Sequence, residues 1–364
     1  MAKILTALPQ AIRALVCACL TLVPHALPAT AQGFAGMGSD ADGFQLPAPG
    51  RAFSFPQDHG AHPGFRIEWW YVTANLEDAE SRAFGAQWTL FRASLSPDPG
   101  EGWTSSQIWF AHAGLTDASR HFTAQRFARG GIGQAGVMAQ PFHAWINDWA
   151  MIGRDNSAEA LDNLQIQARG ADFAYDLALA AEGPLVTHGE GGYSVKSPRG
   201  QASYYYSQPH YHVTGMLDLP EGPVAVTGTA WLDREWSSQP LAPSQTGWDW
   251  FSLHLEDDTK LMVYRLRDAE AADFVPGTHI LPDGTAQHIP DGAITLTPEG
   301  TAQVAGREIP VRWRIQWPDK GYDLHTAPLN PQSWMDTNVP YWEGPVTVQG
   351  SHSGKGYLEM TGYE

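Results

Sequence analysis

The sequence has few basic residues and hardly any cysteine. Of its 364 residues, 22 are lysine or arginine and 39 are aspartate or glutamate, which gives a formal net charge of −17. Nucleic acid and anionic lipid head groups repel a protein with this charge, so we exclude nucleic-acid binding. Cys17 and Cys19 are the two cysteines, and both lie near the N-terminus. The rest of the chain therefore has no thiol for catalysis or for metal binding.

The chain also lacks an apolar run of the roughly 20 residues that a membrane-spanning helix needs. Residues 1–31 are instead typical of a secretory signal peptide, in which positive charge accompanies a short apolar segment. Lys3 and Arg13 supply the charge, and residues 14–23, ALVCACLTLV, supply the apolar segment. A membrane anchor or a lipidated N-terminus is the alternative. We expect cleavage after Ala31, which ends an Ala-Thr-Ala motif, and a periplasmic or secreted location for the remaining chain.

Extended apolar periodicity of the helical kind is missing as well. No stretch longer than about three turns repeats its apolar residues every 3.6 positions. Short runs rich in β-branched and aromatic residues alternate instead with Gly, Pro, Asp and Asn, which is the pattern of antiparallel β-proteins. The sequence therefore predicts an all-β fold. The expected strands are 66–76, 83–95, 106–116, 164–170, 173–180, 212–219, 224–233, 248–257, 260–268, 309–318 and 344–351.

The Gly- and Ser-rich stretch 186–203 is the best candidate for a domain boundary. We predict a first domain at 53–200 and a second at 204–364. Each would contain about eight strands, roughly the number that closes a barrel around one small ligand. Residues 32–52 are rich in Gly, Ala, Asp and Pro, and we expect a flexible N-terminal segment there. The fold prediction is thus two consecutive antiparallel β-barrels packed together.

Acidic residues stand beside tryptophan at several places in the chain. Glu68 precedes a Trp-Trp-Tyr run, and Asp233 and Glu235 precede Trp236. Because residues i and i+2 share one face of a strand, Glu68 is expected on the face of Trp70, and Asp233 on the face of Glu235. Aromatic surroundings of this kind have two explanations.

In the first explanation, the large side chains fill wide barrels and the acids accept hydrogen bonds from indole or arginine groups. In the second, an apolar pocket raises the pKa of a carboxyl group, which then acts as an acid near neutral pH. Tryptophan faces would stabilise a developing cation in such a pocket. We expect Glu68 to brace a site through Arg66, Arg234 or an indole N–H and not to perform the chemistry itself. Both explanations remain open for Asp233 with Glu235.

Signals for metal or nucleotide chemistry are weak. His210 and His212 share a strand face and could chelate a metal, but a third ligand and an HExxH motif are missing. We expect no metal and no cofactor, and place these histidines near a pocket mouth. Tyr206 belongs to a tyrosine-rich run at 203–212, which suits either the core or a pocket wall. There is no G-x-S-x-G motif for a nucleophilic serine.

Four stretches together carry a family resemblance. They are DHGAHPGFRIEWWYVTANLE, GTAWLDREWSSQPL, GWDWFSLHLEDDTKLMVYRLRD and YWEGPVTVQGSHSGKGYLEMTGY. Their content and order resemble the AttH/CrtC-like family of secreted predicted hydrolases, to which carotenoid 1,2-hydratases are more distantly related. The likeness runs from about residue 53 to the C-terminus, and it implies two lipocalin-like barrels.

The resemblance also implies a mechanism. Carotenoid 1,2-hydratase protonates an isoprenoid double bond without a redox cofactor, and water then traps the carbocation. Asp233 would be the acid, Trp236 a pocket wall, and Trp250 and Tyr264 would lie nearby. The run DREW at residues 233–236 is similar to the corresponding motif in the AttH branch of the family. Several members of that branch resemble proteins that accompany an ABC export system.

We therefore carry three hypotheses. In the first, an exported lipocalin-like protein binds an apolar small molecule or lipid and serves an ABC transporter of the inner membrane. In the second, it is a cofactor-independent hydratase or hydrolase of a hydrophobic substrate that uses Asp233 or Glu235. In the third, it is a structural or interaction module. The expected ligand-binding residues are Glu68, Trp70, Tyr206, His210, His212, Trp236, Trp248, Trp250 and Tyr264.

Overall fold

The computed structural model describes residues 41–154 and 160–363, and the expected signal peptide with its cleavage position lies outside them. The described chain forms antiparallel β-sheets and three short 3-10 helices, Gln57–His59 (η2), Gly102–Thr104 (η3) and Pro318–Lys320 (η4). The prediction of an all-β fold is confirmed. Among the described residues there is no helix of sufficient length and apolar character to span a membrane.

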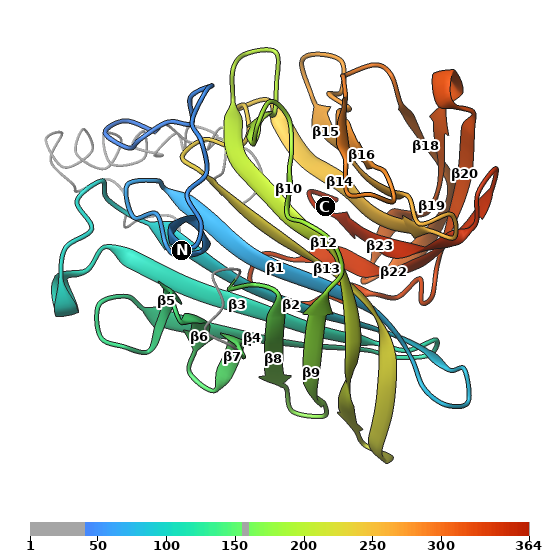
Figure 1. Cartoon of the computed structure of the whole chain (residues 1–364), viewed down its shortest axis with the longest axis horizontal. Helices are drawn as coiled ribbons and strands as arrows, with labels where there is room; N and C mark the ends of the chain where they lie inside the picture. Colours follow the sequence, from blue (N-terminus) through green and yellow to red (C-terminus); the bar gives the residue numbers. More distant parts are fainter. Residues whose placement is uncertain (1–40, 155–159, 364) are drawn as a thin grey trace, which may run out of the picture. The chain divides into compact units, whose positions relative to one another are not determined.

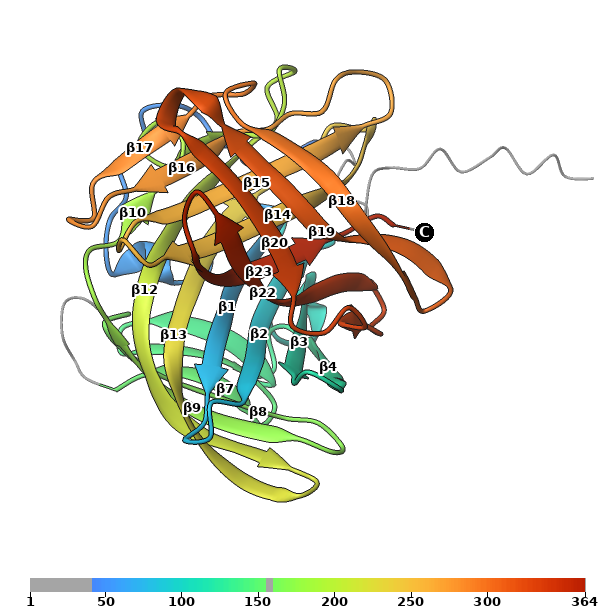
Figure 2. The ribbon, with the colours of Figure 1, turned by 90° about the vertical axis from the view of Figure 1, so that its right-hand side faces the viewer.

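The first sheet contains 13 strands. Their bounds are β1 Ile67–Glu77, β2 Ala83–Ser94, β3 Gln107–Thr116, β4 His121–Arg129, β5 Ala135–Ala139, β6 Phe142–Ile146, β7 Trp149–Gly153, β8 Asn163–Arg169, β9 Ala174–Ala181, β10 Val186–Thr187, β11 Tyr193–Val195, β12 Ala202–Leu219 and β13 Gly222–Ser237. The main path runs β4-β3-β2-β1-β13-β12-β9-β8-β7-β6-β5, and both β10 and β11 pair with β12 outside it. Long strands β12 and β13 run beside β1 and β2 (Figure 2).

The second sheet contains 10 strands from the C-terminal part of the chain, coloured yellow to red in Figure 1. Their bounds are β14 Gln245–Leu255, β15 Lys260–Asp268, β16 Gly277–Ile280, β17 Ala286–Ile289, β18 Thr295–Val304, β19 Arg307–Trp317, β20 Tyr322–Pro328, β21 Trp334–Met335, β22 Tyr341–Gly350 and β23 Gly354–Met360. The strand order is β17-β16-β15-β14-β23-β22-β20-β19-β18, with β21 paired to β22.

The change from one sheet to the other falls later than the predicted domain boundary. It lies between Ser237, the end of β13, and Gln245, the start of β14, and not at residues 200–204. The physical reason is that β12 and β13 pair with β9 and β1 of the first sheet. The Gly- and Ser-rich stretch 186–203 contributes the short strands β10 and β11. Both sheets belong to one compact unit.

Residues 41–52 belong to the segment expected to be flexible, and they form no strand. Two backbone N–H groups of this segment nevertheless donate hydrogen bonds, one to the loop before β1 and one to the first sheet. Gln45 donates to the carbonyl of Gly64 at 2.9 Å, and Ala48 donates to the hydroxyl of Tyr204 at 2.9 Å. This part of the segment is therefore held against the barrel.

The first sheet curves around its own core and is nearly closed as a barrel. Trp70 of β1, Trp88 of β2 and Trp149 of β7 are buried in the same hydrophobic cluster. The hydroxyl of Tyr175 in β9 donates across the barrel to the carbonyl of Gln87 in β2 at 2.6 Å. Large side chains at alternate positions fill the interior, as expected for a barrel of this size.

Strand β1 is buried on both of its faces, which explains its unusual content of aromatic residues. Glu68 and Trp70 point into the barrel of the first sheet, where Trp70 joins the core. Trp69 and Tyr71 point the other way and pack in a third cluster, together with side chains of the second sheet such as Trp250. One face of β1 thus fills a barrel, and the other belongs to the interface between the sheets.

Glu68 connects three neighbouring strands through buried ion pairs. It is fully buried and accepts hydrogen bonds from Arg92 of β2 and Arg234 of β13. The backbone N–H of His62 donates to it as well, at 2.9 Å. Burial alone would raise the pKa of Glu68, but Arg92 and Arg234 outweigh burial and hold the pKa well below its usual range. The carboxylate is therefore charged at neutral pH and does not serve as a proton donor.

We predict that Glu68→Gln lowers the free energy of unfolding by about 3–5 kcal/mol, because it leaves two buried guanidinium groups without their counter-charge. Urea unfolding at pH 7 measures the change. Glu77→Gln on the same strand is the matched control, since Glu77 forms only an exposed pair with Lys355 at 3.3 Å. Equal losses in the two variants would contradict the role given to the buried pairs.

Candidate functional site

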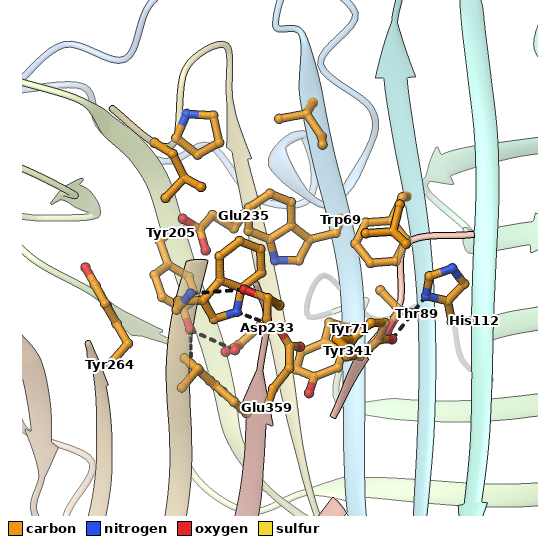
Figure 3. A pocket seen from close by; sticks show the side chains of 18 of the residues that line it. Trp69, Tyr71, Thr89, His112, Tyr205, Asp233, Glu235, Tyr264, Tyr341 and Glu359 are labelled. Atoms are coloured by element: carbon orange, nitrogen blue, oxygen red, sulfur yellow. Dashed lines mark hydrogen bonds between the residues drawn. The ribbon is translucent and has the colours of Figure 1, made fainter. Parts of the chain in front are cut away.

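A cavity of about 270 Å³ lies between the two sheets and is lined mainly by aromatic and aliphatic side chains. Strands β1, β2, β3, β12 and β13 line it from the first sheet, and β14, β15, β22 and β23 line it from the second. Figure 3 shows Asp233 and Glu359 near the middle of this cavity, with Trp69, Tyr71 and Tyr205 around them. Neither sheet alone could enclose this space.

Asp233 lies on the cavity wall, and both of its carboxyl oxygens accept hydrogen bonds. Trp231 Nε1 donates to Oδ1 at 2.6 Å, and the Tyr205 hydroxyl donates to Oδ2 at 2.7 Å. The Ser207 hydroxyl also donates to Oδ1. Burial raises the pKa of Asp233 to about 7, although these hydrogen bonds act in the opposite direction. Asp233 therefore gains and loses its proton in the neutral pH range, as a general acid must.

Glu235 faces the same cavity two residues later, but its partners differ. Lys196 Nζ lies 2.8 Å from Glu235 Oε1, and the Ser203 hydroxyl also donates to that oxygen. Burial alone would lower the pKa of Lys196, but the charge of Glu235 outweighs it and the pKa is raised. The ammonium group also stands 4.4 Å from the ring centre of Tyr264. Glu235 is thus one half of a buried ion pair.

The second sheet contributes two more carboxyl groups. Glu343 of β22 and Glu359 of β23 are directly opposite one another in the strand register. Trp248 Nε1 donates to Glu359 at 2.5 Å, and the Tyr71 hydroxyl donates to Glu343. Burial raises the pKa of Glu359 to about 7 and raises that of Glu343 well above its usual value. Adjacent carboxyl groups in apolar surroundings resist ionising together, so at least one keeps its proton at neutral pH.

The structure brings five of the predicted site residues to the cavity. These are Asp233, Glu235, Trp248, Trp250 and Tyr264. The indole N–H of Trp250 donates to the Tyr205 hydroxyl at 3.2 Å, so a residue of the second sheet orients the phenol that binds Asp233.

Four other predicted residues lie on the opposite faces of their strands. Trp70, Tyr206 and Trp236 are part of the barrel core of the first sheet, and Glu68 is buried beside them. Trp236 stacks on the ring of His62, with 3.9 Å between ring centres. These four residues miss the cavity because side chains alternate along a strand, so neighbouring positions point to opposite faces.

His210 and His212 lie away from the cavity. His210 lies within a register irregularity of β12, between Gln208 and Tyr211, and His212 follows it, where the strand continues toward its exposed end. His210 Nδ1 is 3.6 Å from an oxygen of Glu182, and His212 is exposed. Within residues 41–154 and 160–363, no three His, Cys, Asp or Glu side chains are grouped so as to hold a metal ion.

Sequence reasoning missed several cavity residues. Trp69 and Tyr71 could have been found by the alternation rule, had the other face of their strand been chosen. Lys196, Tyr341 and Glu359 had no such signal, because their positions depend on long-range strand pairing and on how the two sheets pack.

Comparisons with known proteins agree with this architecture. The sequence model of a family described as AttH-like matches residues 46–363. The crystal structure of a protein from Nitrosomonas europaea assigned as AttH is 33% identical in sequence, with a TM-score of 0.77. The match covers 88% of this chain and 100% of that chain, and the expected lipocalin-like fold is confirmed. No curated protein sequence matches the chain.

Two further crystal structures share the fold at low sequence identity. Kievitone hydratase from Nectria haematococca is 15% identical, with a TM-score of 0.63 over 88% of this chain and 98% of that chain. CghA, solved with Sch210972, is 13% identical, with a TM-score of 0.56 over 88% of this chain and 95% of that chain. At these identities the likeness shows the fold alone.

The raised pKa of Asp233 predicts a specific dependence of stability on pH. The pKa is near 4 in the unfolded chain and about 7 in the folded protein, so the folded protein binds the extra proton between these values. The contribution of Asp233 to stability is therefore present at low pH and falls as the pH rises from 4 to 7, by at most about 1.4 kcal/mol per pH unit.

Asp233→Asn removes this titration. We expect the stability of the variant minus that of the wild type to increase from pH 4 to pH 7 and to level off above pH 7. Altered hydrogen bonds with Trp231 and Tyr205 add an offset that does not change with pH. Denaturant unfolding across this range measures the difference, and a difference that is constant with pH would contradict the assigned pKa.

Proposed function

The chain belongs to the AttH-like family, and we propose that it adds water to, or removes water from, an apolar unsaturated molecule held between its two sheets. The observation that carries this proposal is Asp233, a carboxyl group that retains its proton up to neutral pH on the wall of an aromatic cavity. The shared fold of kievitone hydratase supports it. The reaction needs no redox cofactor, because it changes no oxidation state.

The first chemical step is protonation of a double bond. Asp233 gives its proton to one alkene carbon and becomes a carboxylate, while the other carbon becomes a carbocation. Trp69, Trp250 and Tyr205 line the same cavity, and their ring faces can stabilise that positive charge. Their apolar bulk also suits a substrate such as an isoprenoid, whose branched double bond gives a tertiary cation.

The second step needs a base on the other side of the substrate. Glu359 projects from the second sheet, whereas Asp233 projects from the first. With a pKa of about 7, Glu359 is partly ionised at neutral pH and can take a proton from water as the water oxygen attacks the cation. The product is an alcohol, with Asp233 ionised and Glu359 protonated.

A carrier function is the second candidate, and a row of phenylalanines favours it. Phe91 and Phe110 line the cavity and stack with 4.6 Å between ring centres. Phe110 lies 6.3 Å from Phe127, whose side chain is 48% exposed. The row connects the cavity with the surface, as a protein that exchanges an apolar ligand or lipid requires. In that role a periplasmic protein would serve an ABC transporter of the inner membrane, and Asp233 would only bind a polar group of the ligand.

Both functions predict that the cavity binds a small apolar probe. We expect N-phenyl-1-naphthylamine to bind with an increase in fluorescence, and Ala93→Trp, which fills the cavity lined by Ala93, to weaken binding at least tenfold. Ala286→Trp is the control, because Ala286 is exposed on β17. Equal binding by both variants would place the probe outside the cavity.

The enzyme and the carrier differ in turnover. We expect the protein to exchange hydrogens of the methyl group on the hydroxyl-bearing carbon of linalool, a tertiary allylic alcohol, for deuterium from D₂O, as mass spectrometry would show. This exchange requires Asp233, because the cation loses a methyl proton to Asp233 and regains one from it. Asp233→Asn should reduce the rate at least 100-fold, in the range of general acid catalysis, while N-phenyl-1-naphthylamine still binds. Asp176→Asn, on exposed β9 surface, is the control. Unchanged exchange in Asp233→Asn would remove Asp233 as the acid, and probe binding without any exchange would favour the carrier.

A further inference from the structure

A chain of hydrogen bonds leads from Asp233 to a second pocket. The Ser207 hydroxyl donates to Asp233, and Ser207 Oγ lies 2.6 Å from His188 Nε2. On the other side of the ring, His188 Nδ1 lies 2.8 Å from Thr278 Oγ1. The first three residues belong to the first sheet or its loops, and Thr278 belongs to β16 of the second sheet. The hydrogen-bonded groups thus cross the interface between the sheets.

The inner part of this chain is shielded from solvent, whereas its outer end is not. Ser207, His188 and Thr278 are each at most 2% exposed. His188 and Thr278 nevertheless line an outer pocket of about 600 Å³, and Tyr264 forms a wall shared between this pocket and the cavity around Asp233. His288, directly opposite Thr278 in the strand register, lines that outer pocket and is itself exposed. A proton from solvent can therefore reach the outer end of the chain.

Each hydrogen bond between Thr278 and Asp233 can donate in the same direction, toward Asp233. Because Ser207 uses its proton toward Asp233, its oxygen accepts from His188, so His188 carries its hydrogen on Nε2. Nδ1 is then free to accept from the Thr278 hydroxyl. Burial, together with the charge of Lys196, lowers the pKa of His188 well below its usual value, so the ring is neutral and holds a single proton.

We infer that the Ser207–His188–Thr278 chain returns a proton from water in the outer pocket to Asp233 while the inner cavity is occupied. The inference rests on the proposed function, in which each turnover leaves Asp233 ionised. Four transfers balance the step. Ser207 gives its proton to Asp233, His188 Nε2 gives its proton to Ser207, and Thr278 gives its proton to His188 Nδ1. Water of the outer pocket gives one proton to Thr278 and becomes hydroxide, which the proton that Glu359 releases to solvent on product departure neutralises.

A separate route is useful because the inner cavity loses its water when an apolar ligand fills it. Trp231 and Tyr205 occupy the remaining hydrogen-bonding positions on Asp233, and neither leads to the outer pocket. The ring of His188 can take a proton on one nitrogen and release one from the other, which a hydrogen-bonded chain needs at its centre. His188, Ser207 and Thr278 thus act through Asp233 and do not contact the substrate.

Hydrogen exchange at the Asp233 carboxyl tests this route without any turnover. The whole protein at pH 5, saturated with N-phenyl-1-naphthylamine so that the cavity around Asp233 is filled, is mixed rapidly with D₂O. The C=O band of the protonated carboxyl is followed by infrared spectroscopy. The band is assigned by its loss in Asp233→Asn. We expect His188→Phe to slow the exchange at least tenfold. We expect the same of His188→Gln, which keeps a polar side chain but lacks two exchangeable ring nitrogens.

His254→Phe is the matched control. His254 is a half-buried histidine at the interface, 5.8 Å from the ring of Trp231, but it bonds to the carbonyl of Pro209 and not to any of Ser207, His188 or Thr278. We expect wild-type exchange in this variant. Wild-type exchange in both His188 variants, or slowing by Tyr205→Phe alone, would show that protons arrive through the cavity and would overturn the relay. If the His188 variants slow the carboxyl exchange as expected but the wild-type protein exchanges no hydrogens of linalool, the proposed reaction is rejected and the relay is not.

Discussion

Burial of the second half of strand β13, residues 230–237, on both faces is the constraint on which the rest of this structure depends. One face, with Arg234 and Trp236, closes the barrel of the first sheet. The other face, with Asp233 and Glu235, meets the second sheet. A strand with two dry faces normally carries apolar residues throughout. Here the side chains of Arg234, Asp233 and Glu235 are accommodated because each of them has hydrogen-bond or ion-pair partners. Arg234 belongs to the face that builds the barrel, whereas Asp233 and Glu235 belong to the face that lines the cavity.

The same division sets the protonation of the buried acids. Glu68 and Asp233 are both almost completely buried, yet their pKa values move in opposite directions. Two guanidinium groups beside Glu68 stabilise its charge, whereas Asp233 receives only hydrogen bonds from neutral groups. Neutral donors offset part of the desolvation but not all of it. Asp233 can therefore act as a proton donor because no cationic side chain is paired with its carboxyl group. The nearby ammonium group of Lys196 is paired with Glu235 instead.

Much of the fold could be predicted from local patterns, since runs such as 66–76 and 248–257 lie almost entirely within strands. Which face of each strand lines the cavity could not be predicted in this way. Aromatic residues occupy consecutive positions in β1, so composition does not distinguish Trp69, which lines the cavity, from Trp70, which fills the barrel. Glu359 gave no signal because its role arises from the pairing of β23 with β14 and β22. Glycine and serine at 186–203 indicated a linker, whereas the hairpin partners available on β12 turn that stretch into strands.

The cavity is shared between two sheets, and this links ligand affinity to the cohesion of the molecule. Tyr71 bonds to Glu343 and Trp250 bonds to Tyr205 across the interface. Tyr71, Tyr205 and Trp250 also line the cavity that a ligand would fill. A ligand that fills the space therefore adds contacts to both sheets at once and favours the state in which they are joined. Substitutions in the interface far from the cavity would then alter affinity through the spacing of the sheets. Sequence divergence at that interface is a route by which one scaffold could come to accept substrates of different thickness.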